Sequence, residues 1–232
     1  MRVVRRVTLA LSSIALSPTV LLAHGVAAGD KISILQSSGI LAIPFAYLGA
    51  RHMVTGYDHL LFLLGVIFFL YRLKDVALYV TLFAIGHSTT LLLGVLAQVH
   101  VNAHLVDAVI GLSVVYKALD NLSAFRIWFG VQPDARVATL LFGFVHGLGL
   151  ATKILDFEMS PDGLLPNLIA FNVGVEIGQI LALSAILIVM NHWRRTRGFP
   201  SLEYRANVAI MAAGFVMAGY QLAGCFILGS LI

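Results

Sequence analysis

The stretch R-H-M-V-T-G-Y-D-H-L-L-F-L-L-G-V-I-F-F-L-Y at positions 51–71 combines ionisable residues with a long apolar run. It places His52, Asp58 and His59 at the start of a segment that is apolar enough to enter a lipid bilayer. Ionisable side chains at membrane depth cost free energy, so the few that occur there usually have a function. The question is therefore what these three side chains do and which later residues join them.

The composition indicates an integral membrane protein. Of the 232 residues, 59% are hydrophobic and 11% are charged, whereas a soluble domain carries about 25% charged residues. The apolar residues fall in long runs separated by short polar connections, which is typical of polytopic helical membrane proteins. Backbone groups have no water partner in lipid, and the runs are too long and continuous for barrel strands. We therefore predict an all-α fold, a polytopic bundle of about six transmembrane helices in the lipid bilayer.

Charge and cysteine content exclude several other classes of protein. The net charge of +4 comes from positive residues spread over the loops, which does not indicate nucleic-acid binding. The single cysteine, Cys225, excludes an intrachain disulfide and a C-x-x-C metal or redox site.

The first residues are typical of a secretory signal peptide. A basic start is followed by an apolar region at 7–20 and a small residue, Ala23. Cleavage after Ala23 divides the chain into a signal peptide, 1–23, and a single transmembrane helical domain, 24–232. His24 would then be the mature N-terminus, where an amine beside an imidazole can chelate a divalent metal. The alternatives are an uncleaved first helix and a cut after Ala28 that removes His24.

Six membrane spans are expected after the signal peptide. We place them at 40–71, 76–99, 104–121, 135–154, 165–190 and 206–231. In the first span, Pro44 and Gly49 interrupt the apolar run, which we interpret as the start of the span or as a half-helix before it. Gly56 marks a second break, directly before Tyr57, Asp58 and His59.

The charge of the loops predicts the orientation. Lys and Arg occur in the first, third and fifth loops, whereas the loops at 98–104 and 156–166 contain neither. Because cytoplasmic loops carry an excess of positive residues, the odd loops are predicted to be cytoplasmic. Both mature termini then lie outside a bacterial inner membrane, as a cleaved signal peptide requires.

His52 and His59 are expected to share one helix face. They are seven residues apart, which brings them within about 20° of each other on a continuous helix. Asp58 points away from His52 on a straight helix. It would either orient an imidazole as a hydrogen-bond acceptor or be redirected by a break at Gly56. The alternative is a pair of interfacial histidines packed against neighbouring helices.

Later spans add two more imidazoles. His87 lies near the middle of the second span, where its alternative role is a helix–helix hydrogen bond. His146 in the fourth span is flanked by Gly143 and Gly147, whose G-x-x-x-G spacing allows another helix to approach closely. In the third span, Lys117 is expected either to form a structural ion pair with the nearby Asp120 or to extend its ammonium group to the membrane surface.

The fifth span contains a polar stripe. Asn172, Glu176 and Gln179 are four and then three residues apart, so they share one helix face. The Glu176 carboxylate needs a partner, a proton or a cation at this depth. We predict a metal site formed by His52, Asp58, His59, His87, His146 and Glu176, with His24 at the entrance and Asn172 and Gln179 in support. Imidazole, carboxylate and amide oxygen together suit Ni²⁺, Co²⁺, Zn²⁺ or Cu²⁺.

At these residues the chain resembles the HupE/UreJ family of membrane proteins. The resemblance rests on H-x5-D-H at 52–59, G-Y-D-H-L-L-F-L-L at 56–64, F-G-F-V-H-G-L-G at 142–149 and F-N-V-G-V-E-I-G-Q at 171–179. It covers nearly all of the mature chain. Some members carry F-H-G-x-A-H-G in the fourth span, where this chain has Phe142 in place of the first histidine. In this it resembles the second branch of the family.

The resemblance implies a permease for nickel or cobalt, associated with hydrogenase and urease systems. The divalent transition metal ion is then the substrate, and metalloenzyme maturation proteins are candidate partners. Three other functions fit the same residues. They are a membrane-embedded zinc hydrolase with Glu176 or Asp58 as base, a b-type haem protein with His87 and His146 as axial ligands, and a metal-delivery or assembly partner without transport.

Overall fold

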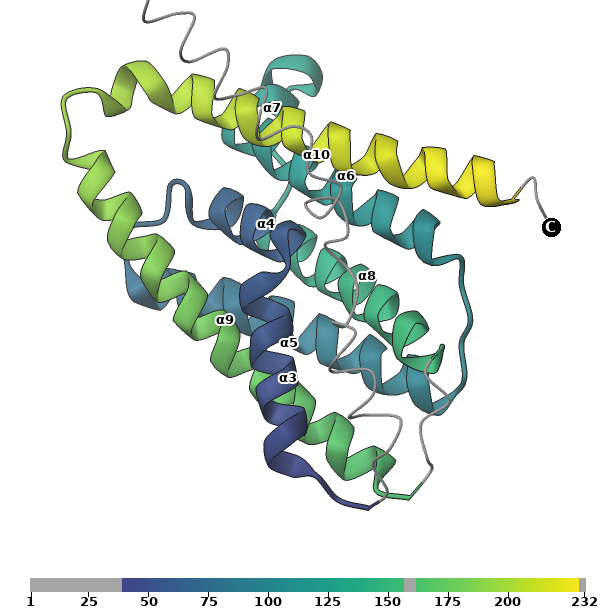
Figure 1. The fold of residues 1–232 in the computed structure, drawn as a ribbon. Helices are drawn as coiled ribbons and strands as arrows, with labels where there is room; N and C mark the ends of the chain where they lie inside the picture. The colour runs from purple at the N-terminus through teal and green to yellow at the C-terminus, as the bar shows by residue number, and fades with distance from the viewer. Residues whose placement is uncertain (1–38, 157–161, 230–232) are drawn as a thin grey trace, which may run out of the picture.

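The computed structural model describes residues 39–156 and 162–229, in which every regular element is an α-helix (Figure 1). The helices are α3 (Ala42–Thr55), α4 (Tyr57–Ile67), α5 (Leu73–Leu96), α6 (Ala103–Asn121), α7 (Ala124–Phe129), α8 (Ala135–Leu155), α9 (Leu164–Arg194) and α10 (Phe199–Gly229). The all-α prediction is confirmed for this part of the chain. The predicted signal peptide and His24 lie outside the described residues.

Four of these helices are long and apolar enough to cross a membrane, namely α5, α8, α9 and α10. α6 occupies the position of the third predicted span, but it contains Asp107, Lys117 and Asp120, which lower its mean hydropathy. α4 is apolar but only 11 residues long. The structure therefore supports an integral membrane protein, while length and composition do not confirm all six predicted spans.

The first predicted span consists of two helices. α3 ends at Thr55, and Gly56 adopts an extended conformation (φ −74°, ψ 108°) before α4 begins at Tyr57. The predicted break at Gly56 is confirmed. α3 is the half-helix that was expected before the rest of the first span, and Pro44 and Gly49 both lie within it without breaking it. Pro44 is tolerated there because it lies in the first turn, where backbone N–H groups have no partner within the helix.

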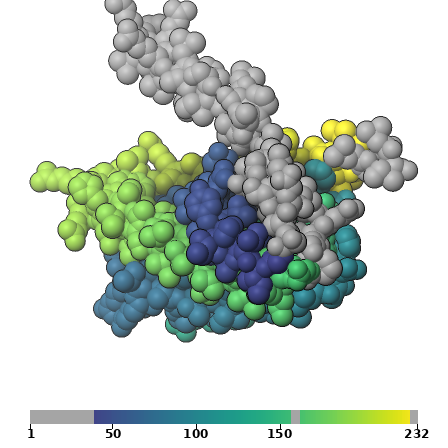
Figure 2. All heavy atoms as spheres, turned by 60° about the horizontal axis from the view of Figure 1, so that its bottom comes forward, coloured from purple at the N-terminus to yellow at the C-terminus, as the bar shows by residue number. Residues whose placement is uncertain are grey.

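Three helix pairs pack most closely: α3 with α9, α5 with α8, and α6 with α10. Glycine permits each close approach. A Cβ atom at Gly174 of α9 would overlap the carbonyl oxygen of Ala46, and one at Gly147 of α8 would overlap that of His87. The close approach predicted from the G-x-x-x-G spacing in the fourth span is confirmed. Figures 1 and 2 both show α3 lying beside the first part of α9.

α4 is fixed at its end by Arg194 from α9. The guanidinium donates to the carbonyl oxygens of Phe68 (3.2 Å from Nε) and Leu70 (2.8 Å), and also to that of Ile67. The carbonyl of Ile67 is the last of α4, and those of Phe68 and Leu70 come after it, so none has a partner within the helix. Arg194 thereby joins the broken first span to α9.

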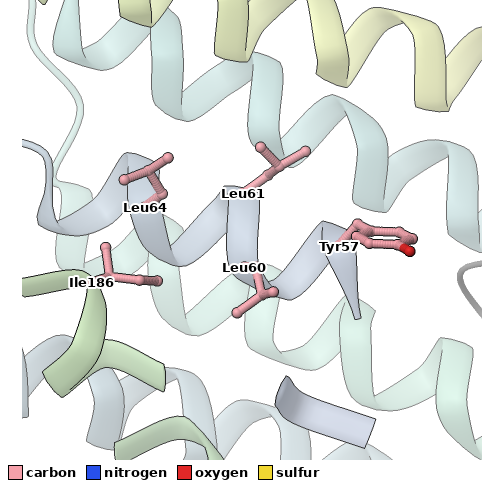
Figure 3. Close-up of a pocket in the computed structure, with 5 residues that line it drawn as sticks. All are labelled: Tyr57, Leu60, Leu61, Leu64 and Ile186. Atoms are coloured by element: carbon pink, nitrogen blue, oxygen red, sulfur yellow. The ribbon is translucent and has the colours of Figure 1, made fainter. Parts of the chain in front are cut away.

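The outer side of α4 is apolar. A groove of about 440 Å³ is lined by Tyr57, Leu60, Leu61, Leu64 and Ile186 (Figure 3). The polar residues of α4, Asp58 and His59, are instead buried inside the bundle. α4 thus presents leucines to the groove and its ionisable groups to the other helices.

α7 is a short helix that the sequence analysis did not predict. It occupies the connection between α6 and α8 and exposes Ile127, Trp128 and Phe129. Exposed aromatic residues next to membrane helices are typical of the membrane–water interface.

Candidate metal site

Four imidazoles form a cluster with His59 at its centre. His52 comes from the last turn of α3, His59 from the first turn of α4, His87 from α5 and His146 from α8. The ring centroid of His59 lies 5.0 Å from that of His52, 6.2 Å from that of His87 and 4.9 Å from that of His146. His59, His87 and His146 are at most 2% exposed. Residues far apart in the sequence therefore form one cluster inside the bundle.

The cluster offers two sets of ligand atoms that share His59. One set is His52, His59 and His87, and the other is Asp58, His59 and His146; in each set the ligand atoms lie within 4.8 Å of one another. Nitrogens bound to one cation with bonds of about 2.0–2.1 Å lie roughly 3.3 Å apart. Small side-chain rotations would therefore let a single cation bind all three residues of either set.

The break at Gly56 directs Asp58 and His59 into the cluster. A Cβ atom at Gly56 would lie 2.7 Å from Nδ1 of His59 and 3.0 Å from Oδ1 of Asp58, so the position has no room for a side chain. The Asp58 carboxylate also lies in the first turn of α4, where a negative charge is favoured by the helix dipole. The break thus places a carboxylate and an imidazole at a helix N-terminus inside the bundle.

Asp58 orients His59. The two side chains form a hydrogen bond of 3.0 Å between Oδ1 of Asp58 and Nδ1 of His59. A carboxylate accepts hydrogen bonds, so Nδ1 of His59 carries the proton and Nε2 carries the lone pair that can bind a metal. The other oxygen, Oδ2, lies 4.0 Å from Nδ1 of His146. Both roles considered for Asp58 from the sequence, redirection at Gly56 and orientation of an imidazole, agree with this geometry.

Ser113 of α6 orients His146 and was not predicted. Its hydroxyl donates to the carbonyl oxygen of Ile110 at 2.6 Å, and its Oγ lies 3.4 Å from Nε2 of His146. Because the hydroxyl proton is used on Ile110, Oγ can only accept from His146, which leaves the lone pair on Nδ1. A serine that bonds to its own helix gives no signal in the sequence.

His87 and two amides are buried without hydrogen bonds among the described residues. Both ring nitrogens of His87 and the amide atoms of Asn172 and Gln179 have no hydrogen-bond partner there. A buried polar group without a partner costs about 1–3 kcal/mol. The arrangement around His87, beside His52 and His59, fits a cation as the missing partner of this imidazole.

The structure does not bring Glu176 to the cluster. Its side chain is exposed on the outer surface of α9, whereas Asn172 and Gln179 on the same helix are buried. The step of four residues from Asn172 rotates Glu176 by about 40° around the helix. That rotation carries it past the edge of the face packed on α3, which explains why the stripe expected from the sequence is divided.

A narrow cavity adjoins the cluster. It is lined by His52, His59 and His146 together with Asp107 and Lys153, and its volume is about 10 Å³, close to what one water molecule needs. Neither Asp107 nor Lys153 was predicted from the sequence as part of the site. The signal for Lys153 was a cation in the last turn of the fourth span, opposite an acid near the outer end of the third.

Several other polar residues of the spans and loops lie outside the cluster. Lys117 forms the expected ion pair with Asp120 towards the end of α6. His100 bonds to the carbonyl oxygen of Gln98 at 2.8 Å, and His104 bonds to Oε1 of Gln221 at 2.8 Å. Both hydrogen bonds are made by Nδ1, and neither histidine belongs to the cluster around His59.

Comparison with known proteins identifies the family of this chain. Residues 28–228 match the profile of the family described as HupE / UreJ protein. Curated proteins gave no significant match, and neither did solved structures. The matched segment contains the H-x5-D-H residues and every histidine of the cluster, and spans nearly the whole chain. The chain therefore belongs to the HupE/UreJ family.

Proposed function

We propose that this protein is a permease that moves a divalent transition metal, nickel or cobalt in the first instance, across a membrane. The observation that carries the proposal is the buried cluster of His52, Asp58, His59, His87 and His146 within a bundle of apolar helices. Buried imidazoles with a carboxylate are the ligands of borderline divalent metals such as Ni²⁺, Co²⁺, Zn²⁺ and Cu²⁺. Membership of the HupE/UreJ family supports a role in handling such metals.

The two overlapping sets of ligands suit passage better than permanent binding. A transported ion has to bind well enough to enter and weakly enough to leave. His59 belongs to both sets, so a cation can exchange His52 and His87 for Asp58 and His146 without losing all protein ligands. Asn172 and Gln179, whose buried amides have no hydrogen-bond partner among the described residues, are candidates on α9 for further oxygen ligands. Glu176 is not part of this proposed site.

The proposed topology has six crossings. They comprise the broken pair α3–α4 and the helices α5, α6, α8, α9 and α10. The sparse positive charge of the loops at 98–104 and 156–166 supports an external position for them, in the inner membrane of a bacterium. A cleaved signal peptide would expose His24 as a metal-collecting N-terminus on the same side.

The zinc hydrolase is the second candidate, because a set of three imidazoles with an open position also fits catalytic zinc. Among the described residues, the zinc hydrolase lacks a suitable general base. Glu176 is exposed on the outside of α9, and Asp58 already accepts a hydrogen bond from His59. The haem alternative is disfavoured by space, because the cavity beside His146 measures only about 10 Å³.

A metal-resolved uptake assay tests the proposal. The full chain is reconstituted alone in liposomes, and uptake of Ni²⁺, Co²⁺, Zn²⁺, Cu²⁺ and Mn²⁺ is measured with and without a proton gradient. We expect uptake of Ni²⁺ or Co²⁺ that disappears in His59→Ala and persists in His192→Ala, an exposed histidine outside the cluster. Metal binding without flux would favour a delivery partner, and retained zinc with hydrolysis of a lipid or peptide would favour the enzyme.

A further inference from the structure

A buried ion pair adjoins the histidine cavity. Asp107 of α6 and Lys153 of α8 line the same cavity as His52, His59 and His146. Nζ of Lys153 donates to both carboxylate oxygens of Asp107, at 2.9 and 2.8 Å. The side chain of Lys153 is only 16% exposed and that of Asp107 only 6%. Burial of both charges costs desolvation free energy, so a lone structural role is a weak reason for placing the pair here.

The pair continues outward through two more polar side chains. Nε2 of Gln221 donates to Oδ2 of Asp107 at 3.3 Å, and Oε1 of Gln221 lies 2.8 Å from Nδ1 of the half-buried His104. His104, Gln221, Asp107 and Lys153 thus form a row from the start of α6 to the cavity. The start of α6 and the ends of α8 and α10 lie together on the right of Figure 1. The loop before α6, at 98–104, lacks positive charge and is therefore proposed to lie outside the membrane.

α8 presents the cavity with one face. His146, Gly149 and Lys153 are three and then four residues apart, so they follow one another along that face. A Cβ atom at Gly149 would lie 3.1 Å from Cγ1 of Val106 and 3.7 Å from Oδ1 of Asp107. Because Gly149 has no side chain, the position between His146 and Lys153 on this face leaves the cavity open.

We propose that Lys153 closes the outer end of the metal path: its ammonium group holds the Asp107 carboxylate that an incoming divalent cation must take over. This inference rests on the permease proposed above. Ammonium and divalent metal compete for the same carboxylate oxygens, and the doubly charged ion gains more Coulomb energy from them. The lysine stem is flexible, so the ammonium can move aside without a change in the backbone. Gln221 keeps the carboxylate in place during the exchange.

The reactivity of the Lys153 amine tests the displacement in the unmodified protein. The full chain in liposomes is treated with an amine-acylating reagent with Ni²⁺, with Mg²⁺ and without added metal, and acylation is quantified by mass spectrometry. We expect Ni²⁺ to raise acylation of Lys153 at least about fivefold, the lower end of ordinary coupling between two sites. Lys117, which is paired with Asp120, is the internal control and should not change. If Ni²⁺ binds and the reactivity of Lys153 is unchanged, the proposal that Lys153 acts as a gate at the outer end of the path is refuted.

Variants test the same competition through uptake. Lys153→Met should lower the Ni²⁺ concentration for half-maximal uptake at least about fivefold, because the competing cation is gone. Lys153→Arg should not, and Lys117→Met is the matched control. Asp107→Asn/Lys153→Met keeps the entrance neutral, which protects folding from an unpaired buried carboxylate. This double variant should need more Ni²⁺ than the unmodified protein.

The outcomes separate the two proposals. If the unmodified protein takes up Ni²⁺ and Lys153→Met takes it up with the same half-maximal concentration, the gate fails and the permease stands. If the unmodified protein neither binds nor moves Ni²⁺ or Co²⁺, both fail.

Discussion

His59 is the residue on which the proposed site depends most. It contributes to both sets of ligand atoms, and its orientation is fixed by the hydrogen bond of 3.0 Å to Asp58. Loss of its imidazole would leave each set with two ligands, fewer than the three or four that hold a transition metal in most protein sites. The carboxylate of Asp58 is the next most important group, because it assigns the metal-binding nitrogen.

Replacement of Asp58 by Asn should weaken metal binding by about 10- to 100-fold, the usual cost of losing the carboxylate that orients a ligating histidine. The measurement is isothermal titration of the purified protein with Ni²⁺ and Co²⁺. Glu176→Gln is the matched control, because it removes an acid from the same bundle but outside the cluster, and its affinity should be unchanged. A large loss of affinity in Glu176→Gln would contradict the geometry described here.

Several site residues were predictable from the sequence, for reasons that also explain the failures. His52, Asp58, His59 and His87 stand out because ionisable groups are rare within apolar runs. Lys153 does not, because a lysine at the end of a span ordinarily extends to the interface. Glu176 was assigned to the metal site from its spacing to Asn172 and Gln179. That spacing gives the direction of a side chain around the helix, but it does not give where the buried face of the helix ends.

At the scale of the helices, glycine determines where the ligands can meet. Gly143 and Gly147 of α8 contact the backbone of α5 at Phe83 and His87. This close approach brings α5 and α8 together at the level of His87 and His146. The helix spacing and the ligand geometry therefore depend on the same small residues.

Gly147→Ala should lower the thermal unfolding midpoint in detergent, since the added methyl would overlap the His87 carbonyl and the Thr90 hydroxyl. Overpacking of this kind costs about 1–3 kcal/mol. Gly219→Ala in α10 is the control, because nothing lies within 4 Å of a Cβ atom there. It should be neutral or raise the midpoint slightly, as Ala favours helix more than Gly. Equal midpoints for the two variants would refute the role of Gly147.

Arg194→Ala should loosen α4 and lower the unfolding midpoint more than Arg195→Ala does. Arg194 donates to three carbonyl oxygens around the end of α4, whereas Arg195 is exposed. Hydrogen bonds that involve a charged group contribute about 1.5–3 kcal/mol each. Hydrogen exchange at residues 57–67, followed by mass spectrometry, should rise only in Arg194→Ala. Identical exchange in both variants would contradict this role.

The helix boundaries followed from the sequence more reliably than the irregular parts did. The break at Gly56 was predicted because glycine precedes a cluster of polar residues within an apolar run. α7 was missed because its six residues lie within a loop and are too few to show a helical period. The half-helix around Pro44 was expected, and proline is compatible with its first turn.

The molecule as a whole is an assembly of three close helix pairs around the ligands. Composition alone predicted an all-helical membrane protein, because long apolar runs have no other stable form in lipid. The pairing of α3 with α9, α5 with α8 and α6 with α10 was not predictable. Membrane helices are apolar on nearly every side, so hydrophobic periodicity does not tell which side faces a neighbour.

The orientation proposed from loop charge can be tested with single cysteines in a Cys225→Ala background. Val99→Cys, before α6, should react with a membrane-impermeant maleimide in intact cells. Thr196→Cys, between α9 and α10, should react only after the membrane is permeabilised. Both positions are exposed, so accessibility to the reagent is not limited by packing. The reverse pattern would invert the topology.

The sharing of His59 between two sets of ligands also sets the stoichiometry. A neutral imidazole offers a single lone pair, so His59 cannot serve two cations together. In the proposed permease, a second ion can bind at His59 only after the first has left. Uptake should accordingly saturate along a simple hyperbola, with one metal bound at the His59 cluster at saturation and no cooperativity between ions at that cluster.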